Sequence, residues 1–251
     1  MNYKYFILST IICLFTACKQ KMHLSKIEGK RIEINDSLSG IQEIEDFIKP
    51  YRVRVNKDMD RILAYSVDTY SKTDGNLNTA IGNLMADAVL ELSNPIYKTR
   101  TGNNIDIVLL NHGGIRASMS KGNITTKTAY ELMPFENEVV VVELKGEHVK
   151  ELVNYLQLAK RAHPIAGLNI ILDKDYNLLE SYIKGVSIDD NKIYHIATSD
   201  YLYEGGDRMT FLKKSDSLHF IDYKIRNLLI DYFKKYDTIN PVIDNRFIQI
   251  K

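Results

Sequence analysis

The sequence of 251 residues is poor in cysteine, with only Cys13 and Cys18. Cys13 lies within an apolar N-terminal stretch, and Cys18 follows shortly after that stretch. If the chain is cleaved before Cys18 and that residue is lipidated, the folded part holds no free thiol. The scarcity of cysteine then excludes a disulfide, a cysteine nucleophile and a thiolate metal site from the folded part.

The sequence also has almost no net charge. Its 33 Lys and Arg residues nearly balance 32 Asp and Glu residues, which gives a formal net charge of +1 at pH 7. A chain without a strong excess of one sign has no global field that attracts polyanions or anionic membranes. We therefore expect no nucleic acid polymer among its partners.

Common catalytic motifs are missing as well. The sequence has no G-x-x-x-x-G-K-[ST] phosphate loop, no G-x-G-x-x-G turn, no G-x-S-x-G elbow and no H-E-x-x-H pair. It also lacks D-x-H, G-N-H-[DE] and H-x-H, which supply the shared ligands of two-metal phosphoesterases. Its six histidines are scattered: His23, His112, His148, His163, His195 and His219. We predict no catalytic residue, no metal site and no cofactor in this chain.

The N-terminus has the pattern of a secretory signal. Lys4 precedes an apolar run over Tyr5–Phe15, which is too short to span a bilayer comfortably. Small residues then lead to a cysteine in Thr16–Cys18. These features predict a lipoprotein signal peptide over residues 1–18, with Cys18 as the lipidated residue. An ordinary signal peptide cleaved near Ala17, or a short N-terminal anchor, remains as an alternative.

A lipidated cysteine would determine the location of the protein. Such a residue carries more than one acyl chain, which is enough for stable anchoring where a single chain is marginal. We therefore expect a membrane-anchored lipoprotein of the cell envelope, facing the periplasm or the exterior.

The rest of the chain divides into a tether and a folded domain. Residues 19–39 are polar and lysine-rich, which predicts a tether with one short edge strand at Arg31–Ile34, and residues 40–251 are predicted to form one domain. Helical apolar spacing predicts helices over 44–62, Thr79–Leu92, Glu147–Leu158 and Ser217–Lys235. Short apolar runs predict strands at Leu63–Val67, Ile105–Asn111, Glu138–Leu144, Leu168–Leu172, Tyr194–Ala197 and Asn245–Lys251. This irregular alternation is typical of an α/β or α+β fold with a mixed β-sheet flanked by helices.

Three turns combine glycine or proline with side chains suited to a ligand. Asn111–Arg116 (NHGGIR) has two glycines, which allow close backbone approach, and an arginine whose fork suits phosphate or carboxylate. Pro134–Asn137 (PFEN) presents an aromatic ring and an amide, and Ser199–Asp207 pairs aromatics with a glycine turn and a carboxylate. Taken alone, the first turn is equally well explained as a tight turn with a surface arginine, and Phe135 alone is better explained as a buried residue.

Together with three further segments, these turns resemble the C-terminal domain of 5'-nucleotidases. The resemblance extends from about residue 45 to 250, and its strength lies in the order of six motifs rather than in any one of them. The motifs are Gly82–Ala88, Asn111–Arg116, Gly122–Thr125, Pro134–Asn137, Ala166–Leu168 and Asp200–Asp207. The resemblance implies the layered fold of that domain.

The resemblance also implies a site for a nucleobase. By position in the motifs, Phe135 and Tyr201 would stack on the two faces of the base. Asn111 and Asn137 would contact its edge. Stacking on an aromatic side chain is worth about 1 to 3 kcal/mol per base in single-strand binding proteins, so two such rings would contribute substantially to affinity.

The same resemblance assigns the rest of the ligand. Asp207 would accept hydrogen bonds from the ribose hydroxyls, and Arg116 would bind phosphate. Gly113, Gly114 and Gly167 would give the ligand steric room. His112 lies within the first motif, where it would either touch phosphate or pack.

In the family that the chain resembles, an N-terminal domain holds two metals and the C-terminal domain selects the nucleotide. We therefore expect a nucleotide- or nucleoside-binding specificity domain that acts in nucleotide dephosphorylation with a separate metallophosphatase, which would hold the divalent metals. Residues 74–80 (DGNLNTA) contain no basic residue where relatives usually carry further phosphate-binding arginines, so a nucleoside is also a candidate ligand. The alternative is a non-catalytic nucleoside-binding or scavenging envelope lipoprotein.

Overall fold

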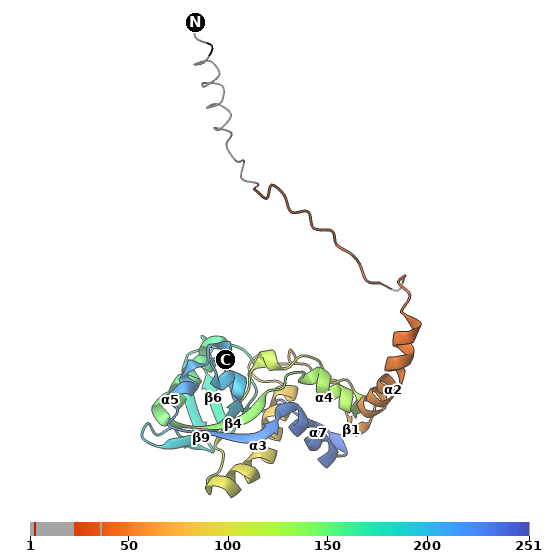
Figure 1. Ribbon diagram of the computed structural model, residues 1–251. Coiled ribbons are helices and arrows are strands. Elements are labelled where there is room, and N and C mark those ends of the chain that lie inside the picture. The colour runs from red at the N-terminus through yellow and green to blue at the C-terminus, as the bar shows by residue number, and fades with distance from the viewer. Residues whose placement is uncertain (1–2, 4–22, 36, 251) are drawn as a thin grey trace. The chain divides into compact units, whose positions relative to one another are not determined.

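The computed structural model describes residues 3, 23–35 and 37–250 (Figure 1). The predicted signal peptide and Cys18 lie outside the described residues, apart from Tyr3. Within the described part, no helix combines the length and the apolar character that crossing a membrane requires. The chain divides into two units, residues 1–48 and 49–251, and each is considered by itself.

Residues 23–35 of the first unit form neither helix nor strand, and all of them are exposed. The edge strand predicted at Arg31–Ile34 was wrong, because a strand needs a neighbouring backbone to accept and donate its hydrogen bonds and no described strand pairs with this segment. The helix predicted after Gly40 is present as α2 (Gln42–Met59), which spans the division between the units. None of its residues is buried.

The second unit contains three β-sheets and the remaining helices. A five-stranded sheet has the order β10-β4-β9-β2-β5, a four-stranded sheet β12-β6-β7-β8, and a three-stranded sheet β11-β1-β3. The strands are β1 Ile62–Ser66, β2 Ile107–Leu109, β3 Gly122–Thr125, β4 Glu138–Lys145, β5 Ile165–Ala166, β6 Leu168–Leu172, β7 Leu178–Ile183, β8 Val186–Ser187, β9 Ile193–Ser199, β10 Leu218–Lys224, β11 Thr238–Ile239 and β12 Phe247–Gln249. The helices are α3 Ala80–Thr101, α4 Thr126–Leu132, α5 Gly146–Ala159, α6 Asp200–Tyr203 and α7 Ile225–Lys235, with 3-10 turns η1 His112–Gly114, η2 Gly206–Arg208 and η3 Thr210–Lys214.

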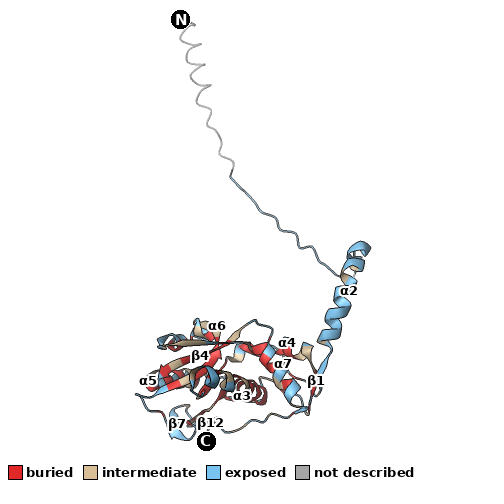
Figure 2. Ribbon diagram, turned by 60° about the horizontal axis from the view of Figure 1, so that its bottom comes forward, coloured by how far each residue is buried: buried red, intermediate tan, exposed pale blue. Residues whose placement is uncertain are grey.

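The central strands of the five-stranded sheet are buried on both faces. Val139 and Val141 of β4 pack with α3 and α7 on one face, whereas Val142 and Leu144 pack with α5 on the other. Successive side chains of a strand point to opposite faces, so a strand covered on both sides is apolar throughout. This explains why β4 contains four consecutive valines, and Figure 2 shows the buried residues concentrated in the strands and the helix faces against them.

Helix α3 begins where the sequence predicted and ends later. The Thr79 hydroxyl accepts a hydrogen bond from the amide of Gly82 at 3.2 Å and so caps the first turn. The predicted end at Leu92 was too early, because the helix continues through Pro95 to Thr101. Tyr97 is fully buried in the core. Its burial offsets the hydrogen bond that a proline removes from a helix.

The long helix predicted over Ser217–Lys235 was wrong in its first half. Leu218–Lys224 is strand β10, which pairs antiparallel with β4 through positions such as Phe220 and Val140, and only the second half forms α7. Apolar residues spaced by three and four fit a helix, but aromatic and β-branched residues also fit a strand. The unpaired edge of β4 decides between the two, because it supplies backbone partners for this segment.

Candidate functional site

The topology of the five-stranded sheet brings the three glycine- and proline-containing turns together. Strands β2 and β9 are parallel, so the turns that follow them leave the same edge of the sheet. Strand β4 runs antiparallel to β9, with Val139 opposite Ser199, so the turn that precedes β4 reaches this edge as well. Turns that are far apart in the sequence therefore meet at one end of three adjacent strands.

A cavity of about 280 Å³ lies where the turns meet. Eight residues line it: Asn111, Gly113, Gly114, Arg116, Phe135, Asn137, Tyr201 and Asp207. All eight belong to the nine predicted binding residues. The volume is near the lower end of the range of about 300 to 1,000 Å³ that is typical of small-molecule sites, so the cavity suits a compact ligand.

Gly167 is the predicted residue that the structure places elsewhere. It has φ +75° and lies between β5 and β6, where a Cβ atom would stand 2.0 Å from the carbonyl oxygen of Asp106. Glycine is needed here because two stretches of backbone approach each other closely. Its position therefore reflects close packing of two backbone segments, and the room for a ligand that the resemblance implied at this glycine stays a prediction.

Two aromatic rings of the cavity are accessible from outside. The exposed fraction is 40% for Phe135 and 45% for Tyr201. Neither ring is therefore part of the buried core, which was the alternative explanation for Phe135 taken alone. A Cβ atom on Gly206 would lie 2.4 Å from Cε1 of Tyr201. The absence of a side chain at Gly206 therefore lets the Tyr201 ring lie against the turn that carries Asp207.

The turn that carries Phe135 is held by Arg226 of α7. This arginine is 4% exposed, and its Nη1 donates a hydrogen bond to the carbonyl oxygen of Pro134 at 3.0 Å. Its Nη2 forms an ion pair with Glu136, and its guanidinium carbon lies 4.1 Å from the ring centroid of Tyr130. The hydrogen bond from Arg226, together with one from Lys224, lowers the pKa of Glu136 to about 2. Sequence reasoning missed Arg226 because nothing local to α7 links it to the turn.

Asp207 is the centre of the polar contacts in the cavity. Its carboxylate accepts hydrogen bonds from Nδ2 of Asn111 at 2.8 Å and from the hydroxyl of Tyr201 at 3.2 Å. Its main-chain carbonyl accepts one from the hydroxyl of Tyr155 at 3.0 Å. Asp207 also has φ +50°, which is uncommon for a residue with a side chain and indicates that its surroundings hold it in place.

The other polar groups keep their binding capacity. The side-chain amide of Asn137 makes no hydrogen bond with any residue that the structure describes, so both its donor and its acceptor are free. Arg116 makes one long hydrogen bond, from Nη1 to the carbonyl oxygen of Gly113 at 3.4 Å, and its guanidinium carbon lies 5.8 Å from the ring centroid of Phe135. The cavity therefore offers the free amide of Asn137 and the guanidinium of Arg116 together with the aromatic face of Phe135.

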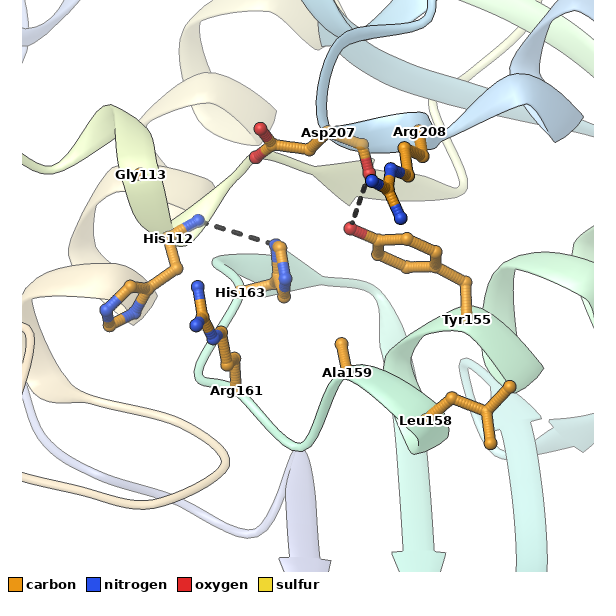
Figure 3. Close-up of a pocket in the computed structure, with 9 residues that line it drawn as sticks. All are labelled: His112, Gly113, Tyr155, Leu158, Ala159, Arg161, His163, Asp207 and Arg208. Carbon is orange, nitrogen blue, oxygen red and sulfur yellow. Dashed lines mark hydrogen bonds between the residues drawn. The ribbon is translucent and has the colours of Figure 1, made fainter.

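A second cavity of about 530 Å³ adjoins the first (Figure 3). It is lined by His112, Gly113, Tyr155, Leu158, Ala159, Arg161, His163, Asp207 and Arg208. Its His163 is buried, and this desolvation lowers the pKa of the imidazole to about 4. Nδ1 of His163 accepts a hydrogen bond from the main-chain amide of His112 at 3.4 Å.

The structure also places His112, whose role the sequence left open. Its Nδ1 lies 3.2 Å from the carbonyl oxygen of Ala162, within hydrogen-bond distance, and the residue lines the second cavity, not the first. As for metals, the described residues contain no group of three or more His, Cys, Asp or Glu side chains that could hold an ion.

Curated proteins similar to this chain include an apyrase and protein UshA. An apyrase from Tabanus yao is 23% identical over 233 residues, which are 84% of this chain and 42% of the apyrase. Protein UshA from Escherichia coli is 26% identical over 201 residues, or 75% of this chain and 34% of UshA. The chain thus spans less than half the length of each relative.

Solved structures share the fold. The 5'-nucleotidase precursor from Thermus thermophilus superposes with a TM-score of 0.69 at 23% identity, over 83% of this chain and 43% of that one. The NAD nucleotidase of Haemophilus influenzae gives a TM-score of 0.62 at 17% identity, over 84% of this chain and 42% of that one. The model of the "5'-nucleotidase, C-terminal domain" family matches residues 61–214, which is more than half of the sequence. The chain belongs to the 5'-nucleotidase C-terminal domain family.

Proposed function

We propose that this chain binds a nucleoside or nucleotide in the cavity at the edge of β2, β4 and β9. The observation that carries the proposal is the convergence of eight residues from three separate turns on one cavity. The family supports it, since this is the domain that binds the nucleotide substrate in 5'-nucleotidases. The proposal is also supported by the chemistry of the lining side chains, which suits a base and a ribose as described next.

The base would lie between the accessible rings of Phe135 and Tyr201, with its edge against the free amide of Asn137. A planar heterocycle offers both an aromatic face for stacking and ring nitrogens for hydrogen bonds, and the cavity presents groups for each. The ribose would lie against Asp207, whose carboxylate oxygens can accept hydrogen bonds from the two hydroxyls in place of Asn111 and Tyr201.

A 5'-phosphate would lie at Arg116, the only cation among the described residues that line the first cavity. A single guanidinium gives one bidentate contact to a phosphate. The stretch 74–80 adds no basic residue to it. We therefore propose that the base and ribose supply most of the affinity, and that nucleosides bind nearly as well as their 5'-phosphates.

We further propose that the chain contributes nucleotide specificity to a separate metallophosphatase, which would hold the divalent metals and cleave the phosphate ester. Support comes from the absence, in the 251 residues, of the histidine and aspartate motifs that supply two-metal ligands. The N-terminal lipobox-like sequence supports a place on a membrane of the cell envelope, with Cys18 as the lipid attachment residue.

Reconstitution tests this function. The purified chain is mixed with a secreted metallophosphatase that lacks this C-terminal domain, and phosphate release from adenosine 5'-phosphate is measured with and without Mn²⁺. We expect hydrolysis only when both chains and the metal are present, and at least about tenfold loss with Asp207→Ala, since hydrogen bonds to a charged group contribute about 1.5 to 3 kcal/mol. Activity that is unchanged by Asp207→Ala and Arg116→Ala would contradict a shared site. Nucleoside binding without any gain in hydrolysis would favour the scavenging alternative.

A further inference from the structure

The second cavity shares a wall with the proposed nucleoside site. Gly113 and Asp207 line both cavities, so the two are separated by little more than these residues. The carboxylate of Asp207 lines the first cavity with Asn111 and Tyr201, whereas its main-chain carbonyl accepts the hydroxyl of Tyr155 in the second. Figure 3 shows that the carboxylate points away from Tyr155 and Arg208. Asp207 is therefore the boundary between the two cavities.

The second cavity carries two unpaired arginines. Arg161 follows α5 and Arg208 lies in η2, and the guanidinium of neither forms a hydrogen bond or an ion pair with a residue that the structure describes. Figure 3 shows Arg161 and Arg208 on opposite sides of the cavity, with His163 between them and Tyr155 beside Arg208. Of the described residues that line this cavity, only Asp207 is acidic. Two free guanidinium groups with little opposing charge suit a phosphate dianion, which can accept a bidentate pair from each.

The backbone of the turn that separates the two cavities places a negative side chain on one side and a positive side chain on the other. Asp207 and Arg208 are consecutive residues with side chains, and both have positive φ, +50° and +62°. This conformation is unfavourable and persists only where the surrounding structure holds it. In this turn, the strained backbone directs the carboxylate of Asp207 toward the first cavity and the guanidinium of Arg208 toward the second.

The positions of the three arginines distinguish two phosphate sites. Arg116 lines only the first cavity, whereas Arg161 and Arg208 line only the second. If Asp207 binds the ribose hydroxyls, a group attached to one of those hydroxyls lies next to the wall that Asp207 and Gly113 form with the second cavity. We propose that the second cavity is a subsite for a phosphate esterified at the ribose 2'- or 3'-position, and that this domain binds nucleoside 2'- or 3'-phosphates. The proposal rests on the nucleoside site proposed above.

Calorimetric titration of the full chain with four ligands tests the subsite: adenosine and its 2'-, 3'- and 5'-phosphates. We expect the 2'- or the 3'-phosphate to bind at least about tenfold more tightly than adenosine, since charge-assisted hydrogen bonds to two guanidiniums outweigh repulsion by one carboxylate. The double substitution Arg161→Gln with Arg208→Gln should remove this gain and leave adenosine binding within about twofold of wild type, because neither residue lines the first cavity.

Two controls separate the possible results. Arg116→Gln should spare the gain from the 2'- or 3'-phosphate, and Lys174→Gln, which removes one exposed positive charge outside both cavities, should change nothing. Adenosine binding without any gain from the 2'- or the 3'-phosphate overturns the subsite and leaves the nucleoside site standing. A gain that persists in the double variant overturns it too. Failure of adenosine to bind at all contradicts the nucleoside site, and the subsite falls with it.

Discussion

Replacing Gly206 with alanine tests whether the Tyr201 ring forms part of the binding site. The new Cβ atom would lie 2.4 Å from Cε1 of Tyr201, 2.5 Å from its Cζ and 2.6 Å from its carbonyl oxygen. Carbon atoms pack best at about 3.5 to 4.0 Å, so these contacts cannot persist. Because one of them is to backbone, rotation of the ring alone does not relieve the clash, and the turn must move.

The expected cost of Gly206→Ala has two parts. Overpacking of a filled position lowers the free energy of unfolding by about 1 to 3 kcal/mol. Displacement of Tyr201 removes one stacking surface, which is worth about 1 to 3 kcal/mol per base. That loss corresponds to nucleoside binding weakened by about 5- to 150-fold.

Gly185→Ala is the matched control for this change. Gly185 has φ +81°, so alanine there is strained by about 1 to 2 kcal/mol, but its Cβ atom would meet nothing within 4 Å. Both variants should lose stability in urea unfolding, and only Gly206→Ala should lose affinity for adenosine in calorimetry. If Gly206→Ala binds adenosine as tightly as Gly185→Ala does, Tyr201 does not contact the ligand.

Three further predictions concern the framework around the site. Arg226→Met should lower stability by roughly 2 to 4 kcal/mol in urea unfolding and weaken adenosine binding, because the Phe135 turn loses the hydrogen bond to the Pro134 carbonyl and Tyr130 of α4 loses its cation–π contact. An unchanged urea midpoint would refute this. Burial lowers the pKa of His163 from 6.5 to about 4, so as the pH falls this histidine takes up a proton in the unfolded chain before it does so in the folded one. The wild type should therefore lose up to roughly 3 kcal/mol of stability between about pH 6.5 and 4, and a His163→Asn variant with the same pH slope would refute this. Thr79→Ala should cost about 1 kcal/mol of stability by removing the cap of α3, while Thr79→Ser should restore most of it in the same assay.

Much of the domain could be predicted because its signals are local. The run of valines in β4 marks a strand buried on both faces, and the cap at Thr79 is a contact within the first turn of α3; the structure has both where they were predicted. The residues of the first cavity also came from short motifs, because turns at the ends of strands concentrate binding groups. That these turns meet required the order β4-β9-β2, which no single motif contains.

The features that sequence reasoning missed depend on contacts between distant segments. Leu218–Lys224 becomes a strand because the edge of β4 is open to it, and Arg31–Ile34 does not because no described strand pairs with it. The close approach of Gly167 to the backbone of Asp106 also joins two segments that are far apart in the sequence. Arg161 and Arg208 lie outside any motif of the sequence, and only folding brings them to one cavity.

The central claim is that the first cavity binds a nucleoside without a metal, and calorimetric titration with adenosine in the presence of a chelator tests it most directly. We predict binding that the chelator does not change and that falls at least about tenfold in Phe135→Ala and in Tyr201→Ala, in line with the worth of one stacking surface. Phe220→Ala, which removes an exposed ring of β10 outside both cavities, should bind normally. Absence of binding by adenosine, guanosine, cytidine and uridine alike, or binding that survives loss of both rings, would contradict the account.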